Sequence, residues 1–405
     1  MRKRIFTLAW EFPPIMSGES VVCFRTLFHS TFCYDVCSGR KGMDSRPWKP
    51  AGNIRAYPLK GKYAGWPFRA AGMFQKLDKL YDYDVVLSRV MPPNGHLAGL
   101  FVKLLKPRIK WAVYFSDPVW NSPFISFRSV FEGKKTQRPN YFLMKLFGIP
   151  AKLAIRFGDL LVFNNERLAR YVLGKKYGKY QSKTVIAPYG LEQVDSPPPR
   201  QKEPGSPVTF AHVGQIYGNR TLSVLIAALE RLRERDPASY ERIRIRQVGF
   251  LCDSERKAAE ESRVAGCFCF EDEVDYTESL QAMREADCLL IIDPVFKRRE
   301  QNLYVPAKLF DYMSTGKPFA AICDGDSATA DIIGTIPGGR MAAHDPEAVC
   351  KMLEGILQDG VPEPDLDAYR RFSCIHGVRA FDEAVRQFEN GERGEGSHCR
   401  SSSRK

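Results

Sequence analysis

Short runs of β-branched and aromatic residues alternate with longer amphipathic stretches along the whole chain. This alternation is typical of βαβ units, in which helices connect the strands of a parallel sheet. In the first half the pattern predicts strands over residues 5–10, 84–88, 110–115, 160–163 and 184–187. We therefore expect an α/β fold, with helices in the intervals between these strands.

The pattern pauses at a proline-rich segment and then begins again. Residues 196–207, SPPPRQKEPGSP, hold five prolines in twelve positions, which resists both helix and sheet and indicates an interdomain linker. After it the pattern predicts strands over 208–214, 243–248, 267–270 and 287–293, and helices over 220–235, from 254 onward and over 277–286. We predict two Rossmann-like domains, over 1–195 and 208–375.

The C-terminal region divides into a helix and a tail. Val378, Phe381, Val385 and Phe388 follow one another at spacings of three and four, which places them on one face of a helix. We expect the segment 376–390 to be a helix that returns to the N-terminal domain. Residues 391–405 show no apolar periodicity and are predicted to be a disordered tail.

Charge is distributed unevenly between the two halves. The chain of 405 residues carries a formal net charge of +13. Residues 1–195 hold 32 Lys and Arg against 13 Asp and Glu, a net charge of +19, whereas the remainder holds 28 against 34, a net charge of −6. Such an excess fits a basic face that docks on anionic lipid or a polyanionic acceptor, a well-solvated surface, or nucleic acid. Of these partners we do not expect nucleic acid.

Neither a membrane span nor a disulfide framework is expected. No run of 18 apolar residues occurs, and residues 1–10 lack the long core of a signal peptide, so we expect a cytoplasmic protein. The 11 cysteines are odd in number and scattered, which favours reduced thiols. Cys33 with Cys37, and Cys267 with Cys269, lack the paired spacing of a zinc site, and no metal site is predicted.

Two glycine-containing segments directly follow predicted strands. In EFPPIMSGES, residues 11–20, Gly18 lets a backbone approach a ligand where helix N–H groups point outward; a plain strand-to-helix turn is the alternative. In HVGQIYGNR, residues 212–220, Gly214 and Gly218 give a flexible turn before Arg220. An Arg at a helix start does not serve the helix dipole, so we interpret Arg220 as a ligand for a diphosphate.

Two further segments carry candidate polar groups. In NLYVPAKLFDYMSTGKP, residues 302–318, a helix is expected from Pro306, and Lys308 and Asp311 share one of its faces. They are suited to phosphate and sugar hydroxyls, although a solvated salt bridge is the alternative. In YFSDPVW, residues 114–120, Asp117 follows a strand at the carboxyl edge of a sheet, where doubly wound folds bind ligands. An Asp before Pro is also an ordinary turn former.

Together and in this order, these segments resemble the retaining family 4 glycosyltransferases, which include bacterial exopolysaccharide and capsule transferases. The resemblance reaches to about residue 390 and also includes LSRVMPPNGHLAGL, GDLLVFNNERLARYVL, VIAPYGLE and VDYTESLQAMREADCLLII. It implies the GT-B fold, in which two Rossmann-like parallel-sheet domains face a central cleft.

The resemblance also implies roles for individual residues. It places Gly18, Arg220 and Lys308 on the donor diphosphate, Val274 to Tyr276 near the base and Asp311 on the ribose; Gly214, Tyr304 and Val305 complete the expected donor contacts. One departure is clear, because the family's Glu-x7-Glu pair needs an acid at position 303, where this chain has Leu303. The backbone N–H groups of residues 302–305 are then the expected substitute.

We expect transfer of a sugar from a UDP- or GDP-sugar to a glycan or lipid-linked acceptor, with retention, in polysaccharide or glycoconjugate biosynthesis. Arg220 and Lys308 would stabilise the departing phosphate without a metal or other cofactor, and Asp117 is the candidate base. The enzyme is expected to lie peripherally on the inner face of the plasma membrane. Two alternatives remain open: a GT-B epimerase or phosphorylase, and a noncatalytic assembly component that binds membrane or nucleic acid.

Overall fold

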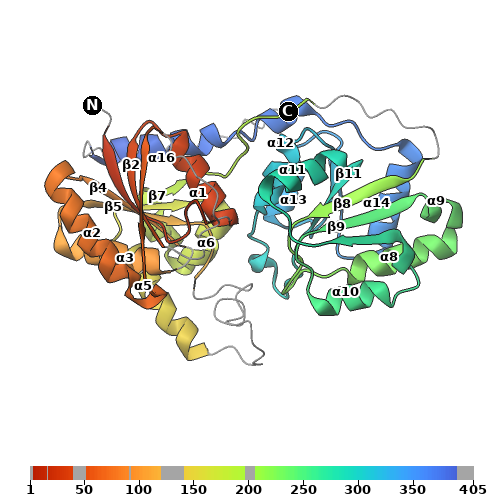
Figure 1. Ribbon diagram of the computed structural model, residues 1–405, viewed down its shortest axis with the longest axis horizontal. Coiled ribbons are helices and arrows are strands. Elements are labelled where there is room, and N and C mark those ends of the chain that lie inside the picture. Colours follow the sequence, from red (N-terminus) through yellow and green to blue (C-terminus); the bar gives the residue numbers. More distant parts are fainter. Residues whose placement is uncertain are drawn as a thin grey trace. The chain divides into compact units, whose positions relative to one another are not determined.

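The computed structural model describes residues 3–15, 17–39, 52–90, 93–119, 141–196 and 206–389. Most of the predicted linker, the predicted tail 391–405 and Trp120 lie outside these residues. The chain divides into two compact units, one comprising Met1–Tyr189 with Cys374–Lys405 and the other Gly190–Ser373. Each unit has its own sheet and its own core (Figure 1).

The described strands of the first unit form one parallel sheet of seven, in the order β3-β2-β1-β4-β5-β6-β7. These strands are β1 Arg4–Leu8, β2 Cys33–Gly39, β3 Ile54–Leu59, β4 Val85–Arg89, β5 Lys110–Phe115, β6 Leu160–Phe163 and β7 Thr184–Ile186. The helices are α1 Gly18–Phe28, α2 Trp66–Tyr81, α3 Asn94–Leu105, α5 Tyr141–Phe157, α6 Glu166–Leu173, α7 Tyr177–Tyr180 and α16 Cys374–Glu389. The strand order reverses between β1 and β4, which is the switch point of a doubly wound sheet.

The second unit repeats this design with a parallel sheet of six described strands, in the order β10-β9-β8-β11-β12-β13. The strands are β8 Val208–Val213, β9 Ile243–Val248, β10 Phe268–Glu271, β11 Cys288–Ile292, β12 Phe319–Ile322 and β13 Arg340–Ala342. The helices are α8 Ser223–Arg235, α9 Pro237–Glu241, α10 Asp253–Glu260, α11 Tyr276–Glu285, α12 Ala307–Ser314, α13 Ala328–Ile333, α14 Pro346–Asp359 and α15 Leu366–Arg370. Here the switch point lies between β8 and β11.

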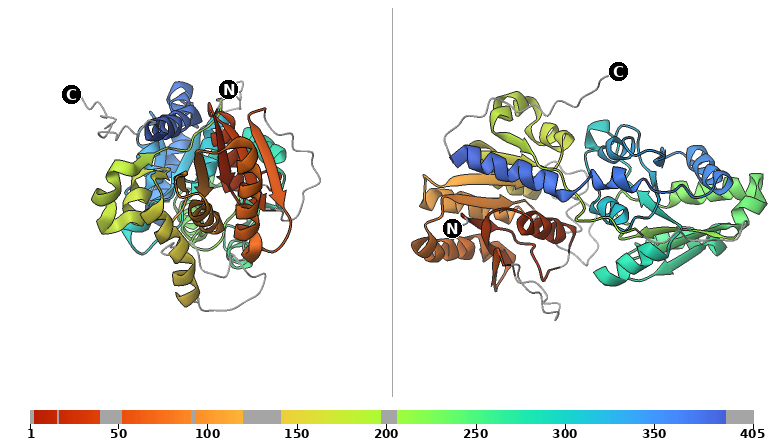
Figure 2. Two further views of the ribbon diagram at one scale, coloured as in Figure 1. Left: turned by 90° about the vertical axis from the view of Figure 1, so that its left-hand side faces the viewer. Right: turned by 90° about the horizontal axis from the view of Figure 1, so that it is seen from above.

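The C-terminal helix α16 packs within the first unit. Phe381 and Val385 join the core cluster that also contains Leu27 of α1 and the inward residues of the strands. Asp382 is buried on the same helix and accepts hydrogen bonds from the Ser30 hydroxyl at 2.7 Å and from the Thr31 backbone N–H at 2.8 Å. Figure 2 shows α16, in dark blue, lying along the strands of this unit. The chain thus enters the second unit and returns.

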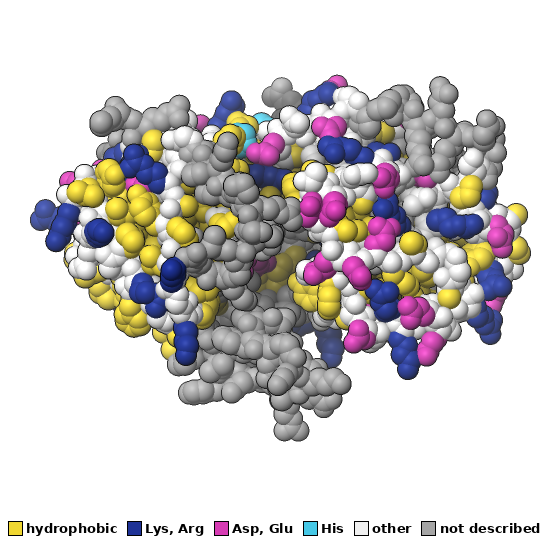
Figure 3. Space-filling model, in the orientation of Figure 1, with side chains coloured by type: hydrophobic (Ala, Val, Ile, Leu, Met, Phe, Trp, Pro, Cys, Tyr) yellow, Lys and Arg dark blue, Asp and Glu magenta, His cyan; other side chains and the backbone are white. Residues whose placement is uncertain are grey.

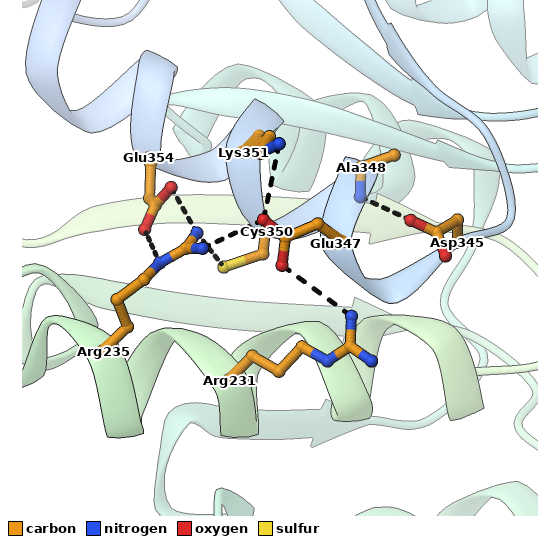
Figure 4. Close-up of polar contacts among 8 residues, drawn as sticks. All are labelled: Arg231, Arg235, Asp345, Glu347, Ala348, Cys350, Lys351 and Glu354. Carbon is orange, nitrogen blue, oxygen red and sulfur yellow. Dashed lines mark hydrogen bonds and ion pairs between the residues drawn. The ribbon is translucent and has the colours of Figure 1, made fainter.

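In the second unit, α8 and α14 cover one face of the sheet together and share its main core. A cluster of ion pairs joins them (Figure 4). Arg235 of α8 contacts Glu354 through two nitrogens, at 2.9 and 2.6 Å, and contacts Glu347 at 3.0 Å. These bonds cross between the two helices and fix their register on a solvent-exposed side.

The surface reflects the uneven charge. On the face drawn in Figure 3, Asp and Glu side chains gather over the second unit, whereas Lys and Arg dominate the charged groups of the first. Within the part of the chain that the structure describes, no helix is long and apolar enough to span a membrane.

Candidate active site

The carboxyl ends of β8 and β11 meet at the switch point of the second sheet, and polar side chains collect there. His212 lies near the end of β8, Gly214 directly follows that strand, and Asp293 directly follows β11. Lys308 enters from the second position of α12. Crevices at such a point are where doubly wound sheets bind ligands.

Lys308 is held by a chain of buried hydrogen bonds. Its Nζ lies 2.7 Å from Nε2 of His212, and Nδ1 of that histidine lies 2.6 Å from Oε1 of Gln247. The amide of Gln247 donates through Nε2 to the carbonyl of Gly214 at 2.8 Å. Because the amide oxygen can only accept, Nδ1 carries the imidazole proton and Nε2 accepts a hydrogen bond from Lys308.

The imidazole of His212 is kept neutral. Burial lowers its pKa well below the usual value, and the nearby charge of Lys308 lowers it further. A neutral ring is the form that can accept from an ammonium group. His212 therefore orients Lys308 without competing with it for an anion.

Gly214 makes room for this lysine. Its φ of +134° lies in a region that side chains rarely adopt. A Cβ at this position would lie 2.7 Å from Nζ of Lys308. Because Gly214 has no side chain, Lys308 can reach the end of β8.

Arg220 lies in the loop before α8, not in the helix, which begins at Ser223; the helix start predicted at residue 220 is wrong. The carboxylate of Glu255 accepts from the Leu222 N–H at 2.7 Å and from the Thr221 hydroxyl at 2.9 Å. Glu255 thus supplies the acid that the start of α8 prefers. Arg220 therefore lies outside α8 and does not oppose the dipole of that helix.

What now supports Arg220 is its place beside Lys308. Its positive charge is close enough to lower the pKa of Lys308, for which burial is the larger cause. Two cations are thus brought together at the switch point, and burial makes the charged form of Lys308 costly. A bound anion would offset this cost and would be attracted by both Arg220 and Lys308.

Asp293 is the buried acid of the site. Burial raises its pKa to about 6, while a hydrogen bond with Thr329 and the charges of Arg220 and Lys308 work in the opposite direction. It therefore titrates near neutral pH. A carboxyl with such a perturbed pKa in a ligand crevice is a functional candidate.

The loop over residues 302–305 closes a small pocket with Asp293. Tyr304 lines it, together with Pro294, Phe296, Asn302, Asp324 and Ser327. Leu303 is 1% exposed and packs inward, so this position presents no group to the pocket. The Asn302 N–H donates to the Arg299 carbonyl at 3.0 Å, which uses one of the N–H groups expected for the donor sugar. Val305 is half-buried at the end of this loop.

Tyr276 and Asp311, both expected near the nucleoside, are brought together. The Tyr276 hydroxyl donates to Oδ1 of Asp311 at 3.3 Å, which links the start of α11 to α12. Val274 precedes the N-cap Asp275 of α11 and is 40% exposed. These side chains form a partly open surface on the same unit as Lys308.

Gly18 and Asp117 belong to the first unit. Gly18 is the first residue of α1, and no atom lies within 4 Å of a Cβ placed there. Asp117 follows β5 and helps to raise the pKa of Tyr189, for which burial is the main cause. Nearby, Arg89 bonds Glu19 at 2.6 Å.

Sequence reasoning missed several residues of the second unit's site. Asp293 carried a visible signal, since it is an acid that ends the apolar run CLLII. His212 and Gln247 carried none, because a polar residue inside a buried strand is usually a structural one. Glu255 lies far along the chain from the helix start that it caps.

No protein-family model and no curated protein sequence matches the chain. Solved structures do. A trehalose-6-phosphate synthase structure, OtsA, is 14% identical with a TM-score of 0.65 and covers 95% of this chain and 99% of its own. An E. coli trehalose-6-phosphate structure bound with UDP-2-fluoro glucose is 15% identical, with a TM-score of 0.64 and the same coverage of 95% and 99%. The lipopolysaccharide outer core galactosyltransferase WaaB, in its apo form, is 12% identical with a TM-score of 0.61, again over 95% and 99%.

The chain has the GT-B fold. Both parallel sheets and nearly the full length take part in the likeness, so the predicted fold class is confirmed. At these identities the likeness shows the fold, and the activity has to be argued from the site.

Proposed function

We propose that the protein is a glycosyltransferase that moves a sugar from a nucleotide-sugar donor to a glycan or lipid-linked acceptor. The observation that carries this proposal is the pair of cations, Arg220 and Lys308, at the switch point of a GT-B second unit. A diphosphate suits such a pair, because its negative charge would offset the cost that burial and the neighbouring Arg220 place on the charged form of Lys308. The E. coli neighbour is bound with UDP-2-fluoro glucose, which favours UDP over GDP.

The two cations would act on the leaving group. As the bond between the sugar and the diphosphate breaks, negative charge grows on the departing phosphate, and positive groups already in place stabilise it. Lys308 is oriented in advance by His212, so it pays little reorganisation when the charge develops. Removing one such contact typically costs about 3 kcal/mol of transition-state stabilisation, which is about a hundredfold in rate.

The remaining donor contacts are assigned by position. We place the base beside Val274 and Tyr276, and the ribose at Asp311. With Leu303 buried, Asp293 and Asp324 are the acids that line the pocket beside Tyr304, and we assign the sugar hydroxyls to them. Retention, and the roles of Gly18 on phosphate and of Asp117 as base, stay predictions from the family resemblance.

The wider role follows the same resemblance. We propose a metal-independent hexosyltransferase of polysaccharide biosynthesis, of the capsule or exopolysaccharide type. We further propose a cytoplasmic location, with the basic first unit docking on the inner face of the plasma membrane. The charge excess of residues 1–195 is the observation that favours this docking.

Turnover by Arg220→Ala tests the assignment. The wild type and the variant would be given a panel of UDP- and GDP-sugars with a membrane extract as acceptor source, and release of the nucleoside diphosphate would be followed. We expect turnover to fall at least about a hundredfold while the melting temperature is kept. Unchanged turnover would rule out the role of Arg220. An isomerised donor without acceptor, or product that requires inorganic phosphate, would instead identify an epimerase or a phosphorylase.

Metal removal tests the proposed source of charge stabilisation. If Arg220 and Lys308 do this work, dialysis against EDTA should leave kcat unchanged within about twofold. A loss of turnover that returns when Mg²⁺ or Mn²⁺ is added would contradict metal independence.

A further inference from the structure

In addition to the pocket beside Tyr304 in the second unit, a pocket lies in the first unit, away from the carboxyl edges of the two sheets. It lies between α5 and the segment from α6 to α7, both drawn in yellow tones in Figure 1, and has a volume of about 750 Å³. Its floor is apolar, and its rim is basic. The floor consists of Leu153, Ile155, Val172 and Leu173, and the rim of Lys152, Arg156, Lys175, Lys176, Lys179 and Tyr180.

Four cations of the rim have no described carboxylate as a partner. No described carboxylate pairs with Arg156, Lys175, Lys176 or Lys179, and the nearest acid on α6, Glu166, is engaged by Arg170 at 2.8 Å. Like charges around one opening repel one another, so an anion in the pocket relieves several repulsions at once.

Apolar surface continues outward from the floor along α5. Ile149 and Phe157 are 48% and 46% exposed, and they stand four residues before and after Leu153. This spacing puts all three on one face of the helix. Lys152 and Arg156 flank that face, which gives α5 an apolar stripe bordered by cations.

This combination favours an amphiphile over a nucleic acid. Nucleic acids offer phosphates to cations, but they stack their bases on aromatic rings, and the floor here is aliphatic. The ring of Tyr180 on the rim is already in contact with Lys179 and Lys183. A membrane lipid offers phosphate and hydrocarbon together. Basic side chains beside exposed apolar ones are typical of surfaces that bind anionic bilayers.

We propose that this pocket binds the phosphate headgroup of an anionic membrane lipid, with the adjoining carbons of the lipid on the floor formed by Leu153 and Val172. The biological meaning of the site rests on the proposed function, because it would hold the enzyme where a lipid-linked acceptor lies. The binding itself is independent of the donor site in the second unit.

Vesicle flotation of the full chain tests the proposal. The vesicles are pure phosphatidylcholine or phosphatidylcholine with about one third phosphatidylglycerol, at low and at physiological salt. In the pocket variant three lysines become glutamine: Lys175→Gln, Lys176→Gln and Lys179→Gln. A matched variant removes three exposed lysines elsewhere on the first unit: Lys60→Gln, Lys62→Gln and Lys76→Gln.

We expect the wild type to bind only the anionic vesicles. The pocket variant should bind them about 100-fold more weakly, whereas the matched variant should stay within about threefold of the wild type. Replacing the apolar stripe by Ile149→Ser with Phe157→Ser should weaken binding about tenfold at unchanged net charge.

Two results would overturn the inference. Equal weakening in the pocket variant and the matched variant would show that total charge, not this pocket, attracts the membrane. Tighter binding to duplex DNA than to anionic vesicles at the same salt would show a nucleic-acid surface. Titration with UDP-glucose separates the two proposals, since vesicle binding through the pocket without donor binding would leave this inference standing and remove the proposed function.

Discussion

The orientation of Lys308 depends on a chain of hydrogen bonds through three other residues. Gln247 fixes the proton of His212 on Nδ1, and His212 then accepts from Lys308 through Nε2. The carbonyl of Gly214 fixes Gln247 in turn. A turn glycine, an amide and an imidazole thus set the position of one ammonium group.

Replacing Gly214 should therefore weaken both folding and donor binding. In Gly214→Ala the new Cβ would lie 2.7 Å from Nζ of Lys308 at a φ of +134°, so both the lysine and the backbone must shift. We expect a loss of about 1–3 kcal/mol in the free energy of unfolding and at least tenfold weaker binding of UDP-glucose by calorimetry.

The matched control is Gly355→Ala in α14, where no atom lies within 4 Å of the added Cβ. It should raise the free energy of unfolding by about 0.5–1 kcal/mol and leave binding unchanged. Donor binding in Gly214→Ala equal to that of the wild type would contradict the close approach of Lys308 to the turn.

The raised pKa of Asp293 predicts a pH dependence of donor binding. Below about pH 6 its carboxyl is protonated, and above that value it is a carboxylate beside Arg220 and Lys308, which we propose as the ligands of the diphosphate. The affinity for UDP-glucose should thus fall about tenfold as the pH rises from 5 to 8. The diphosphate diester of this ligand stays ionised throughout, so the protein is the source of the change.

In Asp293→Asn the part of this dependence centred on about pH 6 should disappear, while a profile that keeps its midpoint would assign it to another group.

The free energy of unfolding should change with pH in the same direction as the donor affinity. Because the folded-state pKa lies above the unfolded value of 3.8, the folded protein holds the proton longer. The free energy of unfolding therefore decreases as the pH rises from about 4 to about 6.

At the scale of elements, α12 is tied to the end of β8 by one buried hydroxyl. Oη of Tyr312 accepts from the Val213 N–H at 2.9 Å and is fully buried. This bond fixes the helix start that carries Lys308 against the strand that carries His212. The site is therefore assembled by packing between elements as well as by the loops.

Tyr312→Phe keeps the ring but leaves the Val213 N–H without its partner. We expect a cost of about 1–3 kcal/mol in the free energy of unfolding, measured by urea denaturation, together with weaker donor binding. Phe310 and Leu309 on the same helix stay in place and provide the apolar packing. A stability equal to that of the wild type would show that water satisfies the strand in the variant.

Most strands of both sheets could be predicted from hydrophobic runs, because strands buried on both faces of a parallel sheet are apolar throughout. Lys110–Phe115, Leu160–Phe163 and Ile243–Val248 have the predicted bounds. The hydrophobic pattern did not predict β2, because this strand carries Asp35, a buried acid that accepts from the Tyr83 hydroxyl at 2.6 Å. The pattern did not predict β3 either, because this edge strand contains Pro58 and exposed residues.

The candidate site was predicted in part. Lys308 and Gly214 are brought together, as are Tyr276 and Asp311. Glu255, His212 and Gln247 could not be assigned roles, since each acts through a partner distant in sequence. The spacing of residues along the chain predicts which of them are neighbours on one helix or strand. These contacts instead depend on the order of the strands in the sheet.

At the scale of the whole molecule, the two halves of the chain differ in charge, and we propose that they bind different partners. The cations of the second unit's site are few and fixed, within a half of the chain whose net charge is −6 over residues 196–405. The first half carries its excess of +19 on a surface that includes the basic pocket beside α5. Donor binding should therefore depend on specific residues, and vesicle binding on a group of cations and on salt.

Calorimetric titration of UDP-glucose into the wild type and into Lys308→Met tests whether Lys308 binds the diphosphate of the donor. Methionine keeps most of the length of the buried side chain and removes its charge, and Lys257→Met on the exposed face of α10 serves as the matched control. The account predicts one donor site in the wild type, unchanged affinity in Lys257→Met and affinity about 100-fold weaker in Lys308→Met. Equal affinity in Lys308→Met, or no binding of any nucleotide sugar by the wild type, would contradict it.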